Sequence, residues 1–103
     1  THTNMVSEGY APIEQYLAHA PRTPATDVYA LAATLYAILT AKVPVAASLR
    51  DRLPMPTVRQ VNPRLSVDVE RAILYGMEIE AVNRPATVSD WLALLPHTYS
   101  QSF

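Results

Sequence analysis

The sequence contains no cysteine, which excludes disulfide bonds and thiolate metal sites. Its three histidines, His2, His19 and His97, stand at spacings that match no metal-ligand pattern, so we interpret them as ordinary surface or loop residues. Glycine occurs only at positions 9 and 76, which are too far apart to form a glycine-rich loop around a phosphate. The sequence therefore predicts neither a metal site nor a nucleotide site of its own.

An excess of charge of one sign is also lacking. Eight Lys and Arg residues stand against nine Asp and Glu residues, the formal net charge is −1, and no block of like charges occurs. Nucleic-acid-binding domains usually carry a basic patch, and helices that lie on membranes carry a basic amphipathic face. We therefore expect no nucleic-acid partner and no membrane partner. The first ten residues show no basic segment followed by an apolar run, so we expect no signal peptide and a cytoplasmic location.

Apolar residues are plentiful and make up 50% of the 103 residues, which is enough for the core of one domain. The longest uncharged stretch covers residues 28–41. A membrane-spanning helix needs about 20 apolar residues, whereas a shorter helix that is hydrophobic on every side is typically buried. We therefore predict a buried central helix over residues 26–41, with Thr26 as N-cap and with Asp27 and Lys42 at the ends that suit the helix dipole.

Two further helices are predicted from capping residues and apolar spacing. Ser66 can cap a helix that runs to about Met77. Residues 87–90 have the spacing of a capping box, for a helix that Pro96 ends. The apolar stripe of this last helix consists of Val88, Trp91, Leu92 and Leu95.

The remaining segments are expected to be short turns and connections. A short helix is expected around residues 46–52 and a single turn near Pro12, because proline suits the first position of a helix. Residues 53–65, which include three prolines, are expected to be irregular. Since no stretch demands a strand, the predicted fold class is all-α.

Residue chemistry alone indicates no active site. The carboxylates of Glu78 and Glu80 lie in a polar helix end and are expected to be solvated. Glu14 and Arg84 each lie close to a proline in a short segment with apolar neighbours, and charged residues in such places are seldom buried unless they are paired. Composition alone gives this particular pairing little weight, because many other charged residues are available.

Four motifs occur in the order in which protein kinases have them. The segment Ser7-Glu-Gly-Tyr-Ala-Pro-Ile-Glu-Gln-Tyr16 resembles the end of the activation segment, in the form found in bacterial, particularly cyanobacterial, kinases of eukaryotic type. Residues 26–40 resemble helix F, residues 62–66 with the helix after them resemble helix H, and residues 83–92 resemble the Arg-Pro element and helix I. The resemblance implies a partial Ser/Thr kinase C-terminal lobe over residues 1–96, built around helix F, and a tail over residues 97–103.

The resemblance also implies roles for single residues. Glu14 and Arg84 match the two members of a buried ion pair that ties the activation segment to the helical base. Asp27 matches the helix F aspartate, which in the family holds the backbone of the catalytic loop. Ile13 and Ala32 depart mildly from the family, which usually has proline at the first position and often has glycine at the second.

Two further groups of residues match positions that kinases use for recognition and regulation. Ser7, Gly9 and Tyr10 match the loop that receives the substrate residue after the phosphoacceptor, although kinases usually have threonine where Ser7 stands. Thr3 lies where many kinases are phosphorylated, and Thr1 is a second candidate. A phosphate there would act by pairing with arginines.

The chain lacks the motifs with which the family performs its chemistry: the Gly-rich loop, the nucleotide-positioning Lys, the His-Arg-Asp loop and the Asp-Phe-Gly metal ligand. Phosphoryl transfer depends on positioning and on the charge of metal ions and that Lys. We therefore expect the chain alone to bind no cofactor and to be inactive. The parent kinase would use ATP and Mg²⁺ to phosphorylate Ser or Thr of a protein substrate.

Two other interpretations stay open. The parent could be a pseudokinase, or the chain a helical module that only binds protein partners, and intact His-Arg-Asp and Asp-Phe-Gly motifs upstream would favour the enzyme. An unrelated helical domain, such as a DNA-binding one, is disfavoured by the acidic balance.

Self-association is a separate expectation. Residues 28–41 stay apolar on every side, whereas the other predicted helices are short and can shield only part of that surface. We therefore expect the chain to self-associate through this helix, with residues 1–20 as the segment most able to exchange between copies.

Overall fold

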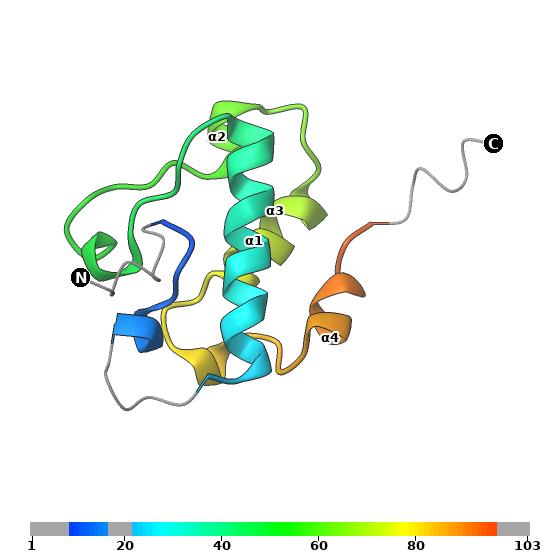
Figure 1. Cartoon of the computed structure of the whole chain (residues 1–103). Helices are drawn as coiled ribbons and strands as arrows, with labels where there is room; N and C mark the ends of the chain where they lie inside the picture. The colour runs from blue at the N-terminus through cyan, green and yellow to red at the C-terminus, as the bar shows by residue number, and fades with distance from the viewer. Residues whose placement is uncertain (1–8, 17–21, 97–103) are drawn as a thin grey trace.

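The computed structural model describes residues 9–16 and 22–96. In this part of the chain the regular structure is helical and no strand occurs, which confirms the predicted all-α class. None of the described helices is both long and apolar enough to cross a membrane. The elements in chain order, with η for a 3-10 turn, are η2 (Ile13–Tyr16), α1 (Pro24–Thr40), η3 (Ala47–Leu49), α2 (Val58–Val61), α3 (Val67–Gly76), η4 (Ala81–Asn83) and α4 (Val88–Leu92) (Figure 1).

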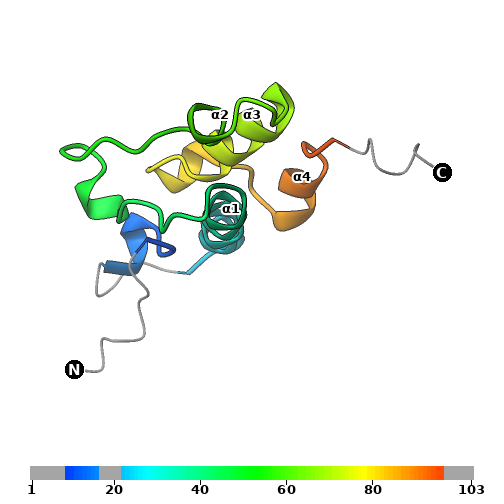
Figure 2. The same ribbon diagram turned by 90° about the horizontal axis from the view of Figure 1, so that it is seen from above.

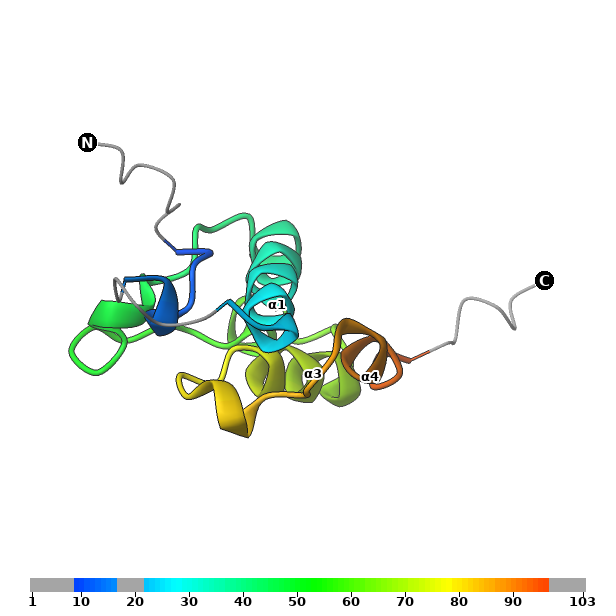
Figure 3. The same ribbon diagram turned by 60° about the horizontal axis from the view of Figure 1, so that its bottom comes forward.

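Helix α1 is the centre of the fold. Viewed along its axis, it has α2 and α3 on one side, α4 on a second side, and η2 and η3 on a third (Figure 2). Figure 3 shows α1 lying across α3, with α4 beside them. The buried core consists of Val28, Tyr29, Ala32, Ala33 and Tyr36 of α1, together with Ala47, Val58, Ile73, Met77 and Trp91.

The start of α1 differs from the predicted one. The helix begins at Pro24 and its N-cap is Thr23, not Thr26. Proline suits this first position because its missing N–H would have no partner inside the helix. The Thr26 hydroxyl oxygen accepts the Thr23 N–H at 3.2 Å and so stabilises the first turn from within. At the other end, Ala41 has a left-handed φ of 58° and donates its N–H to the Ala37 carbonyl at 2.8 Å.

Helices α3 and α4 begin where the sequence predicts. The Ser66 hydroxyl oxygen accepts the Val69 N–H at 3.1 Å, and the Thr87 hydroxyl oxygen accepts the Asp90 N–H at 3.0 Å. Each of these bonds satisfies a donor that the first turn of a helix otherwise leaves without a partner.

Helix α4 is shorter than predicted. It ends at Leu92 instead of continuing toward Pro96. The N–H groups of Leu94 and Leu95 bond to carbonyls three residues back, those of Trp91 and Leu92, at 3.0 and 3.1 Å. Three residues of the predicted stripe, Val88, Trp91 and Leu95, pack in or against the core, whereas the fourth, Leu92, is 49% exposed.

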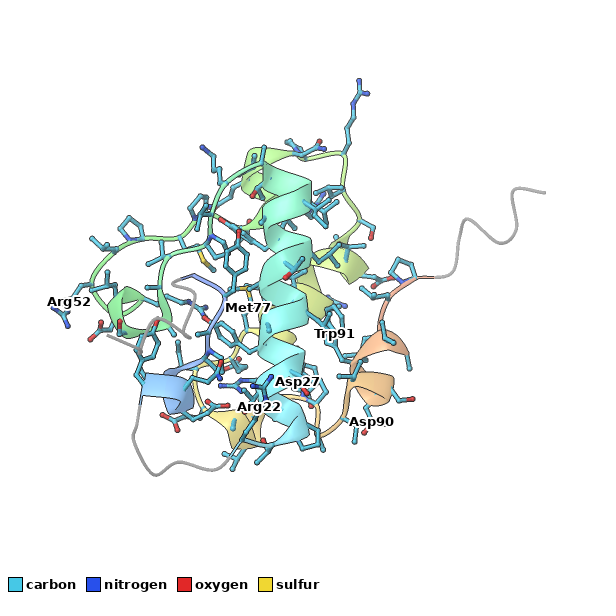
Figure 4. The ribbon with its side chains drawn as sticks, in the orientation of Figure 1. Arg22, Asp27, Arg52, Met77, Asp90 and Trp91 are labelled. Carbon is cyan, nitrogen blue, oxygen red and sulfur yellow. The ribbon has the colours of Figure 1, made fainter. Side chains whose placement is uncertain are left out.

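The junction of α1, α3 and α4 depends on Gly76. The Trp91 ring is buried there, and its Nε1 donates to the Ala72 carbonyl at 2.9 Å. Figure 4 shows Trp91 in the space between α1 and α4. A Cβ added at Gly76 would lie 2.7 Å from the Ala32 Cβ and 2.7 Å from Trp91 Nε1. Because real Cβ atoms do not come that close to other atoms, α1 and α4 can both pack against α3 at this point only if position 76 is glycine.

The predicted irregular connection over residues 53–65 contains a helix. Helix α2 begins after Thr57, whose hydroxyl oxygen accepts the Gln60 N–H at 3.2 Å, while Gln60 Oε1 accepts the Thr57 N–H at 2.8 Å. This reciprocal arrangement is a capping box. The prediction was wrong here, and it was also too long at residues 46–52, where the regular structure is the single turn Ala47–Leu49.

Candidate functional site

Arg84 follows η4, and its side chain is fully buried, with 0% of it exposed. A guanidinium group has five N–H donors, and here each donor has an acceptor. Nη1 and Nη2 donate to the two carboxylate oxygens of Glu14 at 2.8 and 2.9 Å. The remaining three bonds go to the carbonyls of Ala25 (2.9 Å), Ile79 (2.9 Å) and Glu78 (2.7 Å). We call Arg84, Glu14 and these three carbonyls the Arg84 cluster.

Glu14 is supplied by η2 and is 13% exposed at its side chain. Besides the two bonds from Arg84, its Oε2 accepts the Thr26 hydroxyl at 2.9 Å. Burial by itself would raise the pKa of Glu14. The bonds from Arg84, from its own backbone N–H and from Thr26 outweigh burial and hold the pKa below its usual value. Glu14 is therefore a carboxylate that the surrounding donors keep ionised.

Tyr29 of α1 joins the Arg84 cluster to the core. Its ring is fully buried, and the Arg84 guanidinium carbon lies 5.0 Å from the ring centroid. This distance is typical of a cation–π contact. The cluster thus holds together η2, the first turns of α1 and the segment between α3 and η4.

The geometry of the Arg84 cluster suits a structural role. Every N–H of the Arg84 guanidinium group is already hydrogen-bonded, so Arg84 could bind a ligand only by losing one of these bonds. Its side chain is also fully buried and has no surface in contact with solvent. Two carboxylates predicted to be solvated, Glu78 and Glu80, are both exposed. Among the described residues, no group of three or more His, Asp or Glu side chains is arranged to hold a metal ion.

Asp27, predicted as an anchor for the catalytic loop, lies apart from this cluster. Its Oδ1 accepts the Arg22 Nη2 at 2.9 Å, at the N-terminal end of α1 (Figure 4). The side chains of Arg22 and Asp27 are 68% and 49% exposed. The Asp27 carboxylate therefore remains accessible from solvent.

The predicted docking loop is described only from Gly9 onward. Gly9 is buried with a φ of +89°, and a Cβ there would lie 2.7 Å from the Pro44 carbonyl oxygen and 2.9 Å from Val43 Cγ1. Only glycine fits so close to the segment after α1 with this backbone conformation. Tyr10 is half-buried and packs against the core. Ser7, together with the candidate phosphorylation sites Thr1 and Thr3, lies outside the described residues.

A second arginine, Arg50, contacts Tyr29, and no pattern in the sequence indicated this contact. Arg50, just after η3, donates through Nη1 to the Met77 carbonyl and, at 3.4 Å, to the Tyr29 hydroxyl. Met77 is the C-cap of α3, so Arg50 places a positive charge at a helix C-terminus, where carbonyls need donors. The partner is a backbone group 27 positions away, and backbone groups leave no mark in the sequence.

Comparison with known proteins gives one informative match. No protein-family model and no curated protein matches the chain. A solved structure of a bacterial Ser/Thr kinase, titled "PpkA-294 apo form", matches with a TM-score of 0.74 and 27% sequence identity. The alignment covers 88% of this chain and 32% of that chain, so the chain spans about a third of that kinase structure.

The match shows that the chain has the fold of a helical part of a Ser/Thr kinase. It agrees with the coarse form of the sequence resemblance, a piece derived from a kinase.

Proposed function

We propose that the chain is the substrate-docking and stabilising part of the C-terminal lobe of a Ser/Thr protein kinase of the bacterial, cyanobacterial-like kind. The parent would transfer the γ-phosphate of ATP to Ser or Thr of a protein substrate, with Mg²⁺ as the metal. The observation that carries the proposal is the Arg84 cluster, because the kinase resemblance pairs Glu14 with Arg84, and their charged groups lie 2.8 Å apart. The kinase match over 88% of the chain supports it.

In this proposal the Arg84 cluster positions the docking loop. Gly9 is seated against Pro44, and Glu14, five residues later, is held by Arg84. Residues 9–16 are thereby attached to the helical base near both ends. A loop fixed in this way can hold Tyr10 in one orientation toward a substrate chain, which is how substrate-positioning residues assist phosphoryl transfer.

The chemical step would belong to other parts of the parent. The Gly-rich loop, the nucleotide-positioning Lys, the His-Arg-Asp loop and the Asp-Phe-Gly motif do not occur in this sequence. ATP and Mg²⁺ would be bound by those elements, and the 103-residue chain by itself would be inactive. Phosphorylation of the parent at Thr1 or Thr3 is likewise a proposal that rests on the kinase resemblance.

The test is a phosphoryl-transfer assay on the full-length gene product. We expect Mg²⁺-dependent transfer of labelled γ-phosphate to Ser or Thr of a generic basic protein substrate. Arg84→Ala should reduce the rate by releasing the docking loop, whereas Val82→Ala, a change at an exposed position of η4, should not. A full-length product that has no transfer activity and lacks the His-Arg-Asp and Asp-Phe-Gly motifs would overturn the enzyme proposal.

That negative result would favour the alternative, a pseudokinase or helical interaction module. One observation supports this second candidate: large apolar side chains, Ile38 and Val43 among them, are 71% and 69% exposed. Exposed apolar surface of this kind is typical of proteins that bind partners.

A further inference from the structure

Arg50 and Arg84 bind one short stretch of backbone. The carbonyls of Met77, Glu78 and Ile79 follow one another directly after the last residue of α3. Arg50 Nη1 donates to the first of them, and Arg84 donates to the second and the third at 2.7 and 2.9 Å. Carbonyls at and after the last turn of a helix have no partner inside it. Each arginine therefore fixes this stretch by satisfying groups that need a donor.

Tyr29 of α1 also contacts both arginines. The Arg84 guanidinium carbon lies 5.0 Å from the centroid of its ring, and its hydroxyl oxygen accepts the Arg50 Nη1–H at 3.4 Å. Tyr29 is fully buried in the core, so neighbouring side chains hold its ring in place. Arg50 and Arg84 are thus attached to the same two parts of the fold, which are Tyr29 and the backbone after α3.

Arg50 fixes one end of the segment against which Gly9 is seated. A Cβ added at Gly9 would lie 2.7 Å from the Pro44 carbonyl oxygen, so the two backbones are in close contact. Residues 41–46 connect α1 to η3 and contain no helix or strand, so their position depends on the elements at their two ends. Arg50 directly follows η3, and its bonds attach that end to the core and to the end of α3.

We infer that Arg50 is a positioning residue of the docking loop, which holds the loop at Gly9 as Arg84 holds it at Glu14. The inference rests on the proposed function, in which this loop receives a substrate chain. In Figures 1, 2 and 3, η3 lies next to η2, as this role requires. Because both arginines use the same stretch of backbone, they keep the two ends of the loop in a fixed position relative to each other.

Arg50 acts through uncharged acceptors, which makes it a suitable position for a test. Its acceptors are a carbonyl and a tyrosine hydroxyl, and the ion pairs of the described residues contain Arg22, Arg52 and Arg84 but not Arg50. Replacing Arg50 therefore leaves no buried carboxylate unpaired, whereas replacing Arg84 leaves Glu14 without its partner. Arg50→Met also keeps an apolar stem that can pack as the arginine stem does.

Amide hydrogen exchange of the 103-residue chain, followed by NMR, tests the inference without any activity. Ala11 is 3% exposed and lies two residues after Gly9, so its amide reports on that end of the loop. The Trp91 amide, which is hydrogen-bonded within α4, reports on the rest of the fold. Arg50→Met should speed exchange at Ala11 by about tenfold more than at Trp91, because the bonds that it removes hold the loop locally. Equal acceleration at the two amides, or none at Ala11, overturns the inference.

Two further variants complete the exchange experiment. Arg52→Met is the matched control, since the Arg52 side chain is 71% exposed two positions further on, and it should leave both exchange rates unchanged. Arg50→Lys keeps the charge and most of the stem, but its nitrogen ends one bond short of Nη1 and cannot reach both acceptors. It should give the same selective acceleration to a smaller degree. If Arg50→Met does not fold, Arg50→Lys decides by the same criterion.

Steady-state kinetics of the full-length gene product connect the loop to substrate docking. Arg50→Met should raise the KM for the protein substrate on the order of tenfold and leave kcat and the KM for ATP unchanged. A role in stability alone would instead lower kcat, because less of the enzyme would be folded, and would leave KM unchanged. That pattern in an active parent overturns the inference and leaves the proposed function standing. A parent without transfer activity would contradict the proposed function, and the exchange rates would still decide whether Arg50 holds the loop.

Discussion

Two arginine–carboxylate pairs lie at the N-terminal end of α1, and their lengths are almost the same. Arg84 lies 2.8 Å from Glu14, and Arg22 lies 2.9 Å from Asp27. Their surroundings differ, because the side chains of the first pair are 0% and 13% exposed and those of the second are 68% and 49% exposed. In water the attraction is offset by solvation and side-chain entropy. A buried arginine that loses its acceptors has no water to replace them.

The two pairs also differ in what they connect. Glu14 and Arg84 are 70 positions apart in the sequence, whereas Arg22 and Asp27 are five apart. The long-range pair joins η2 to the segment after η4 and so fixes the arrangement of the chain. The local pair can affect only the start of α1. The comparison indicates that burial and connectivity, and not the N–O distance, determine how much an ion pair contributes to the stability of the fold.

The largest effect is expected from Arg84→Ala. This change leaves the Glu14 carboxylate and three carbonyls without their donor in a largely buried place. We expect the free energy of unfolding to fall by about 3–5 kcal/mol, measured by urea denaturation followed by circular dichroism. A loss below about 1 kcal/mol, the size typical of a surface change, would show that the buried pair contributes no more to stability than the exposed pair.

A double variant separates the lost charge pair from the lost hydrogen bonds. Adding Glu14→Leu to Arg84→Met removes both charges and substitutes apolar side chains. Replacing a buried ion pair in this way is often neutral. Here the carbonyls of Ala25, Glu78 and Ile79 would still lack a donor. We therefore expect the double variant to regain only part of the unfolding free energy that Arg84→Ala loses. A complete return to the stability of the native chain would contradict a structural role for those three bonds.

The second effect is expected from Glu14→Gln, and it should depend on pH. At pH 7 we expect a loss of about 2–3 kcal/mol, because the amide offers Arg84 one acceptor and one donor where the carboxylate offers two acceptors. The folded pKa of Glu14 is lowered, so the carboxylate stabilises the fold above its unfolded pKa of about 4.3. That contribution is lost as the pH falls through the folded pKa.

The difference in unfolding free energy between the native chain and Glu14→Gln should therefore shrink as the pH falls from 5 toward 2. Denaturation at a series of pH values measures it. Glu80→Gln provides the control, since Glu80 is exposed and its replacement should give a small difference at every pH. A difference for Glu14→Gln that stays constant with pH would mean that the carboxylate is not held ionised by the cluster.

The third effect is expected from Thr26→Val, which keeps the shape of the side chain and removes its hydroxyl. That hydroxyl donates to Glu14 and accepts from Thr23. At about 1 kcal/mol for each hydrogen bond, we expect a loss of about 1–2 kcal/mol and a rise in the pKa of Glu14. Thr34→Val is the control in dilute solution, because Thr34 is exposed on the same helix. Equal losses for the two variants would contradict a link between Thr26 and the cluster.

The parts of the fold that the sequence predicted share a physical cause. Helix α1 contains a long uncharged apolar run and α3 has apolar residues at helical spacing, and each has a threonine or serine at its start, so local and tertiary preferences agree. Helix α2 was missed, although Thr57 and Gln60 have capping-box spacing, because the prolines around it outweighed a helix of four residues. The N-cap of α1 was misplaced because Thr23 and Thr26 are equally good capping residues, and Pro24 decides between them.

The candidate site could be predicted only in part. The order of the kinase-like motifs indicated that Glu14 pairs with Arg84. The properties of either residue alone would not have indicated this pairing. The three carbonyls that complete the Arg84 cluster could not be predicted, because every residue has a carbonyl and only the fold decides which ones converge. The exposure of Asp27 was equally hidden, since its position at the start of α1 fits a buried anchor and a surface pair alike.

The smallest effect is expected from Arg22→Ala, which tests the exposed side of the comparison. Asp27 would lose its partner but would keep its solvent contact and its favourable place in the first turn of α1. We expect a loss of at most about 0.5 kcal/mol at low salt. Because exposed pairs are screened, this loss should disappear at about 1 M salt, whereas the loss for Arg84→Ala should persist there. Denaturation of both variants at two salt concentrations decides the matter, and a salt-resistant loss above about 1.5 kcal/mol for Arg22→Ala would show that the exposed pair carries structural weight after all.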